Sequence, residues 1–234
     1  MAGFIQIFGT SIMKATLLDT KTKHYRFTAP QWMKRFEAQF PVQVSNYAKF
    51  GSTIEKGSRI LQTRMPQLPS HSHALLEFGG NDCDFNWQTI AEAPDQEHTP
   101  HTPLSRFTAL YRQMIQSLRA HHISPILLTL PPIDADRYFA WFTQKGGLDQ
   151  NRILRWLGDV QMIYRYQELY SETVIKLAYQ TNCPLVDVRS AFLDKRNYRD
   201  LLCEDGIHPN ENGYRLVYDA LLCDYQTNTQ YRMA

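Results

Sequence analysis

Five short apolar runs alternate along this chain with longer stretches whose apolar residues recur at helical spacing, and this alternation limits the fold strongly. The runs are expected as buried strands, because they are rich in branched and aromatic residues and end at glycine, proline or a polar turn. They cover residues 4–8, 42–47, 74–78, 125–130 and 184–188. Alternating strands and helices predict right-handed βαβ units, so we expect an α/β protein with three layers, α/β/α, around a five-stranded parallel sheet.

The stretches between these runs predict helices and two long insertions. Helices are expected over residues 30–40, 53–65, 104–122, 161–180 and 210–224, with Ser52 or Thr53 as a cap of the second. Residues 19–26 are expected as a loop or hairpin. Connections as long as 83–103 and 133–159 are usually functional or disordered, and we expect both as insertions in one domain spanning 1–234.

The second insertion is rich in aromatic residues, including Tyr138, Phe139, Trp141, Phe142 and Trp156. Exposed aromatic side chains mark either a binding site or an interface. The segment is therefore compatible with a lid or acyl-binding wall, with a dimer surface, or with a helix packed on the core. The sequence leaves these alternatives open, and a homo-oligomer with them.

The composition is that of an ordinary globular protein. The 234 residues are 43% hydrophobic and 21% charged, with a formal net charge of +2 and no basic stripe that would indicate a nucleic-acid partner. No apolar run approaches the ~20 residues that a membrane span needs. The first expected strand begins almost at once, with no signal-peptide pattern, so we expect a cytoplasmic protein, although a processed secreted protein would show the same pattern.

Metal, redox and nucleotide chemistry have little support in the sequence. The four cysteines, Cys83, Cys183, Cys203 and Cys223, form no CxxC pair and are expected to be reduced. Two histidine pairs, His71 with His73 and His98 with His101, lack obvious third and fourth metal ligands. A P-loop and the glycine pattern of a dinucleotide site are both missing. We therefore expect neither a metal nor another cofactor.

Residues able to perform acyl transfer follow the expected strands or lie in the last loop. They are Ser11, Gly51, Asn81, and the pair Asp205 and His208. The carboxyl ends of parallel strands lie at one edge of a sheet, so residues far apart in sequence meet there. Taken alone, each of these residues is also explained as an ordinary turn residue or helix cap.

Together these residues suit the chemistry of a serine nucleophile. A histidine removes the hydroxyl proton near neutral pH, and a carboxylate on its other nitrogen fixes the ring. His208 and Asp205, three residues apart, supply both groups. The amide of Asn81 and the backbone N–H groups of Gly51 and Ser11 are candidate donors to the oxyanion of a tetrahedral intermediate.

The same residues carry a resemblance to the SGNH hydrolases, also called GDSL-type esterases and lipases. The family's Gly-Asp-Ser block is similar to Gly9-Thr10-Ser11, and its Asn-x-x-x-x-Gly-x-Thr turn to residues 46–53. Its Gly-x-Asn-Asp block is matched by residues 79–82, and its Asp-x-x-His-Pro block by residues 205–209. The four blocks occur in the family's order, each after an expected strand, and jointly they are specific.

The resemblance implies a flavodoxin-like α/β/α fold and a serine hydrolase acting on a carboxylic ester. It assigns Ser11 as nucleophile, His208 as base, Asp205 as its orienter, and Gly51 and Asn81 as oxyanion donors. Thr10 departs from the motif, which has aspartate there. The Gly-x-Ser-x-Gly elbow of the α/β-hydrolases is absent, because position 13 is Met13.

The expected substrate is a small-molecule acyl ester, with acetyl on a sugar as one form. A thioesterase or lysophospholipase acting on longer acyl chains is an alternative, and the aromatic insertion slightly favours an apolar group. A non-catalytic binding or scaffold protein on the same fold is a further alternative. A binder, like a flavin-binding protein of this fold, has no physical need for Ser11, Asn81, Asp205 and His208 together.

Overall fold

The computed structural model describes residues 3–27, 34, 37–40 and 42–228. Its centre is a five-stranded sheet with the strand order β4-β1-β5-β6-β7, and every neighbouring pair is parallel. The strands are β1 (Gly3–Phe8), β4 (Val42–Asn46), β5 (Ser72–Leu76), β6 (Ile123–Leu128) and β7 (Leu185–Val186). The expected five-stranded parallel sheet is confirmed.

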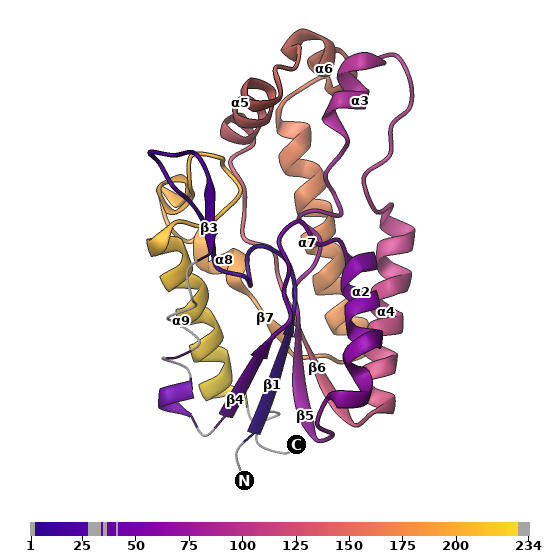
Figure 1. Ribbon diagram of the computed structural model, residues 1–234, viewed down its shortest axis with the longest axis vertical. Coiled ribbons are helices and arrows are strands. Elements are labelled where there is room, and N and C mark those ends of the chain that lie inside the picture. The colour runs from indigo at the N-terminus through magenta and orange to yellow at the C-terminus, as the bar shows by residue number, and fades with distance from the viewer. Residues whose placement is uncertain (1–2, 28–33, 35–36, 41, 229–234) are drawn as a thin grey trace.

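Helices cover both faces of the sheet (Figure 1). On one face α2 (Ile54–Arg64), α4 (Leu104–Ala120) and α7 (Gln161–Thr181) enclose a core that contains Phe8 and Leu76. On the other face α8 (Val188–Leu193) and α9 (Glu211–Thr227) pack against Ile7 and Leu75. Neighbouring strand residues thus serve opposite cores, because side chains alternate across a strand. The three-layer α/β/α arrangement is confirmed.

Several element boundaries differ from the sequence-based expectation. The last strand is only Leu185–Val186, because Asp187 caps α8 by accepting the N–H of Ser190 at 3.1 Å. Thr53 occupies the N-cap position of α2, but neither its side chain nor that of Ser52 caps the helix. Asp82, from the loop after β5, accepts the N–H of Ile54 at 2.9 Å instead. The helix expected over residues 30–40 falls largely outside the described residues.

The two expected insertions form structure above the carboxyl ends of the strands. Residues 83–103 contain α3 (Trp87–Glu92), and residues 133–159 contain α5 (Ala135–Gly146) and α6 (Gln150–Leu157). Figure 1 shows these three helices together at one end of the molecule, beyond the sheet. They share a cluster of buried apolar residues with the start of α7. Short 3₁₀ helices η1 (Met65–Gln67) and η2 (Tyr198–Leu201) complete the connections.

Residues 16–27 form an antiparallel hairpin of β2 (Thr16–Leu18) and β3 (Tyr25–Phe27), separate from the main sheet. Its base is held by Tyr214 of α9, whose hydroxyl donates to the carbonyl of Thr16 at 2.9 Å. No helix among the described residues is long and apolar enough to cross a membrane.

Candidate active site

Ser11 lies just beyond β1, at the point where the chain order of the sheet reverses. Strand β1 pairs with β4 on one side and with β5 on the other, and doubly wound sheets bind ligands at such a reversal. The loop after β1 is closed by backbone bonds, from the N–H of Lys14 to Thr10 and from Thr16 to Ser11, both at 3.1 Å. The Ser11 side chain is almost fully buried in this loop.

Asp205 and His208 occupy a tight turn before α9. One carboxylate oxygen of Asp205 accepts the backbone N–H groups of Ile207 and His208, each at 3.1 Å. Gly206 has φ +73°, and a Cβ there would approach the carbonyl oxygen of Asp134 to 2.6 Å. Only glycine accommodates both the positive φ and this approach. The turn therefore fixes the Asp205 carboxylate beside the backbone of His208.

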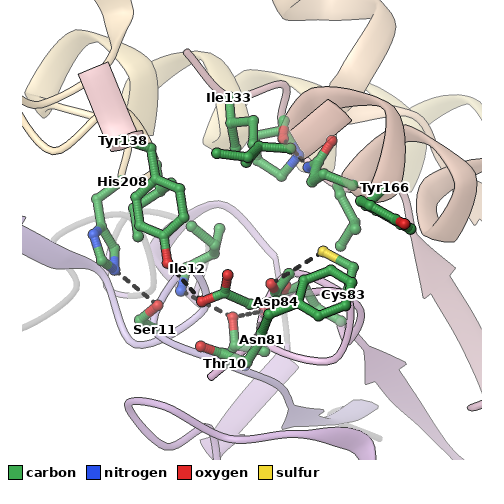
Figure 2. Close-up of a pocket in the computed structure, with 18 of the residues that line it drawn as sticks. Thr10, Ser11, Ile12, Asn81, Cys83, Asp84, Ile133, Tyr138, Tyr166 and His208 are labelled. Atoms are coloured by element: carbon green, nitrogen blue, oxygen red, sulfur yellow. Dashed lines mark hydrogen bonds between the residues drawn. The ribbon is translucent and has the colours of Figure 1, made fainter. Parts of the chain in front are cut away.

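A chain of hydrogen bonds joins three of the predicted residues. His208 Nδ1 lies 2.7 Å from Asp205 Oδ2, and His208 Nε2 lies 2.9 Å from Ser11 Oγ. A carboxylate only accepts, so Nδ1 carries a proton and Nε2 is left to accept from the serine hydroxyl. Figure 2 shows the imidazole pointing at Ser11. All three residues are buried.

The protonation of Asp205 follows from its contacts. Burial alone would raise the pKa of this carboxyl, but hydrogen bonding to the His208 side chain and its charge, with the backbone donors, outweigh burial and lower the pKa. The carboxylate form is thus the one that the turn stabilises.

Asn81 and Gly51 are placed differently by the structure. Asn81 lines the same cavity as Ser11 and His208, and its side-chain nitrogen donates to the carbonyl of Ser52 at 3.1 Å. An amide NH₂ has two donors, so one remains for a ligand. Gly51 is exposed, with φ +63°, in the turn next to Ser52, and is not among the residues lining the cavity.

The cavity beside Ser11 has a volume of about 110 Å³, and its lining is somewhat more apolar than polar (Figure 2). Ser11, Asn81 and His208 are part of its lining, and the two insertions contribute much of the rest. Its apolar and aromatic lining is Ile12, Phe85, Trp87, Leu130, Pro131, Ile133, Tyr138, Ile163, Tyr166 and Ile207. A pocket of this kind suits a small apolar group held beside the serine hydroxyl.

Polar side chains also line the cavity, among them Thr10, Glu77, Gln167 and Asp84. Asp84 is only partly buried and receives two side-chain donors, the Tyr138 hydroxyl at 2.5 Å and the Trp87 indole N–H at 2.9 Å. Burial raises the pKa of Asp84, and these two hydrogen bonds oppose that rise. Tyr138 thus belongs to the pocket wall and braces the second insertion against the first.

The remaining aromatic residues of the second insertion pack within the protein. Phe142 stacks on Trp87 with ring centroids 4.6 Å apart, and Trp156 meets Phe85 edge-on at 5.0 Å. Phe139 is buried in the same cluster. Of the alternatives left open by the sequence, the insertion therefore packs as helices and also supplies a wall of the cavity.

Two residues at the site were not singled out by the sequence. Tyr25 of the hairpin has its ring 5.0 Å from the imidazole ring of His208. Glu77, directly after β5, is buried and accepts hydrogen bonds from Thr10. An acidic residue at the end of an otherwise apolar run is a signal for Glu77, whereas the hairpin sequence carries no comparable signal for Tyr25.

The histidine pairs do not converge. His71 stacks on His122, His98 lies 2.8 Å from the carbonyl oxygen of Ala93, and His101 lies 3.0 Å from that of Asn81. Within the described ranges, no group of three or more His, Cys, Asp or Glu side chains is arranged to hold a metal ion. The four cysteines are free thiols, and only Cys223 is exposed.

A serine, a histidine and a carboxylate in hydrogen-bonded series, at the reversal point of a parallel sheet, are typical of serine-dependent hydrolases. The sequence model of the GDSL-like lipase/acylhydrolase family matches residues 7–216. The chain belongs to this family, and it is an ester hydrolase of the GDSL type.

Known proteins similar to this chain are esterases and acylhydrolases by name. An isoamyl acetate-hydrolyzing esterase of Saccharomyces cerevisiae is 24% identical over 214 residues, covering 81% of this chain and 79% of that protein. A lipase/acylhydrolase of Enterococcus faecalis superposes with a TM-score of 0.63 at 21% identity, covering 96% of this chain and 95% of the other. A variant of an acetyl xylan esterase of Geobacillus stearothermophilus superposes with a TM-score of 0.64 at 19% identity, covering 95% and 94%.

Proposed function

We propose that this protein hydrolyses esters of short acyl groups through an acyl-enzyme on Ser11. The observation that carries the proposal is the hydrogen-bonded series from Ser11 Oγ through His208 to Asp205, which opens on a small apolar cavity. Membership of the GDSL-like family supports the reaction class. Asp205 orients the imidazole and stabilises its protonated form.

The proposed reaction has two halves. In the first, His208 Nε2 takes the proton of Ser11 Oγ as the oxygen attacks the ester carbonyl, and the resulting imidazolium returns that proton to the leaving alcohol. In the second, His208 takes a proton from water, which attacks the acyl-serine, and the proton returns to Ser11 as the acid is released. The amide of Asn81 and the N–H group of Ser11 are the proposed oxyanion donors. The resemblance to the family adds the N–H group of Gly51, although Gly51 does not line the cavity.

Cavity size supports a short acyl group. An engineered cavity of ~150 Å³ in another protein takes up benzene. By that comparison, a space of about 110 Å³ suits an acyl group of roughly two to five carbons. The yeast relative is named for the hydrolysis of an acetate ester, which is consistent with this size. Longer acyl chains, as in a thioesterase or lysophospholipase, would extend beyond this cavity.

The decisive experiment uses a fluorophosphonate, which reacts with an activated serine whatever the natural substrate is. The adduct is mapped by mass spectrometry after digestion of the labelled native protein. We expect one adduct on Ser11, absent in Ser11→Ala and lost in His208→Ala. A folded wild-type protein that gives no adduct would instead support the non-catalytic binding protein.

The acyl preference is measured separately with a series of esters of one alcohol, from acetate to octanoate. We expect kcat/KM to be highest for short chains and to fall once the chain exceeds the cavity. A maximum at eight carbons would support the long-chain alternative and contradict the proposed substrate class.

A further inference from the structure

Glu77 is a buried carboxyl group beneath the loop that carries Ser11. Its Oε2 accepts the backbone N–H of Thr10 at 2.9 Å and the Thr10 hydroxyl at 2.8 Å. Both donors belong to Thr10, the residue directly before Ser11.

Such a carboxyl is costly to bury, so its contacts matter. Glu77 is 1% exposed, and burial raises its pKa to about 7. The ion pairs formed among the described residues do not include Glu77. Hydrogen bonds from the Ser11 loop therefore offset the cost of removing the Glu77 carboxyl from water.

The sheet brings Glu77 to this position. Phe8 of β1 is in register with Leu76 of β5, and the N–H of Glu77 donates to the carbonyl of Phe8 at 3.0 Å. Gly9, which follows β1, therefore lies beside Glu77, which follows β5. A Cβ at Gly9 would lie 3.0 Å from Glu77 Oε2 and 3.2 Å from its carbonyl oxygen. Glycine at position 9 leaves the space in which the carboxyl reaches the loop.

The arrangement also accounts for the departure at Thr10. The Gly-Asp-Ser motif places a carboxyl in the loop itself, whereas this chain has a neutral hydroxyl there and a carboxyl directly after the neighbouring strand. We propose that Glu77 is a positioning residue, which holds the Ser11 loop so that the serine hydroxyl meets His208. The proposal rests on the proposed function of Ser11 as the nucleophile.

The test compares Glu77→Gln with Glu77→Leu. Glutamine keeps a carbonyl oxygen for Thr10, whereas leucine removes every acceptor at similar volume. A displacement of about 1 Å at a reacting group costs on the order of 10²-fold in rate. We therefore expect Glu77→Leu to lower kcat on a short-chain ester, and the rate of fluorophosphonate labelling, on the order of 10²-fold, with little change in KM. Glu77→Gln should recover most of the loss.

A double-mutant cycle separates positioning from a general loss of packing. Thr10→Asp alone places two carboxyls within hydrogen-bond distance and should lower kcat. Thr10→Asp combined with Glu77→Leu restores a single carboxyl and should be more active than either single variant. Residues that act independently would instead give additive losses. Additive losses in the cycle would overturn the proposal.

Gln6→Leu is the matched control. Ser72 Oγ donates to Gln6 Oε1 at 3.0 Å between the same two strands, and both residues are buried near the other end of the pair. Losing this bond should lower the unfolding midpoint while kcat stays within about twofold, as expected for a site that supports the fold alone. A fall in kcat as large as that of Glu77→Leu would overturn the proposal.

Hydrogen exchange of the peptide that spans residues 8–14 provides a readout independent of activity. Glu77→Leu should speed exchange of the Thr10 amide, and Glu77→Gln should do so less. Unchanged exchange in Glu77→Leu would overturn the role of Glu77, as would kcat within about twofold of wild type. Absence of a Ser11 adduct in the wild-type protein would instead show that the proposed function fails.

Discussion

The ring of Tyr25 lies 5.0 Å from the imidazole ring of His208, although the two residues are far apart in the sequence. Tyr25 is supplied by the β2–β3 hairpin, which lies apart from the main sheet. Its pKa is raised, first by burial and then by the nearby charge of Asp205. The hairpin thus covers the side of the histidine–aspartate pair.

Tyr25→Phe tests whether the Tyr25 hydroxyl donates to the Asp205 carboxylate. We expect kcat to fall roughly three- to tenfold with KM little changed, because a hydrogen bond to a charged group contributes roughly 1.5–3 kcal/mol and part of this is regained from water. Steady-state kinetics on a short-chain ester measure the change. Phe27→Leu, on the same strand but exposed, is the control and should leave kcat near wild type. A Tyr25→Phe enzyme with unaltered kcat would show that the hydroxyl does not support Asp205.

Asp205→Asn removes the charge that orients and stabilises the histidine. In the Ser-His-Asp template of another enzyme, the corresponding change lowers kcat by about 10⁴. We expect a loss on the order of 10³–10⁴ in kcat here, with the fold intact by circular dichroism. Asp200→Asn, a nearby exposed aspartate, controls for the change in net charge. A loss below tenfold would mean that His208 does not depend on Asp205.

Asn81→Ala tests the side-chain donor proposed for the oxyanion. Removing one such donor costs about 10²–10³ in kcat, and KM should change little because the donor acts mainly on the intermediate. Asn81→Asp loses the same contact with Ser52 and adds a negative charge, so it should be less active still. An Asn81→Asp enzyme more active than Asn81→Ala would contradict the assignment.

Ile163→Ala should enlarge the cavity, because this buried residue lines it. Hexanoate has two more methylenes than butyrate, and burying each contributes about 0.8 kcal/mol. In Ile163→Ala, the ratio of kcat/KM for hexanoate to that for butyrate should therefore rise roughly tenfold over wild type. Ile153→Ala removes an equally buried side chain from the same cluster without lining the cavity, and it is the control. Equal shifts in both variants would place the acyl group elsewhere.

Glu77 should make the free energy of unfolding fall as the pH rises. Its pKa is raised from 4.5 to about 7, so the protonated form is favoured in the fold, and the associated stability is present below pH 4.5 and lost as the pH passes 7. Three other titratable groups, those of Asp82, Tyr111 and Tyr214, interact electrostatically with the Glu77 carboxyl. Glu77→Gln removes this titration, so its stability relative to wild type should increase by roughly 2–3 kcal/mol from pH 5 to pH 8.5.

Urea unfolding of both proteins at pH 5 and pH 8.5 measures this difference. Glu97→Gln, which replaces an exposed glutamate, controls for the loss of one negative charge. A gap between wild type and Glu77→Gln that is the same at the two pH values would contradict the raised pKa.

Much of the site could be predicted from the sequence because its residues stand in local patterns. Ser11 follows an apolar run that predicts a buried strand, and Asp205 and His208 stand three residues apart in a tight turn. The parallel sheet then places the ends of distant strands at one edge. Asn81 was located by the same reasoning, and the structure places it in the lining of the cavity.

The sequence by itself determined the strand order along the chain, the α/β class and the residues able to attack an ester, because strand and helix periodicity and turn chemistry are local. Only the tertiary structure decided that Tyr25 covers His208, that Tyr138 meets Asp84, and that Glu77 reaches Thr10 across 67 residues of sequence. These contacts depend on strand register and on how the insertions fold back over the sheet. No pattern within a single segment encodes either, since each pair joins segments that meet only after the sheet has formed.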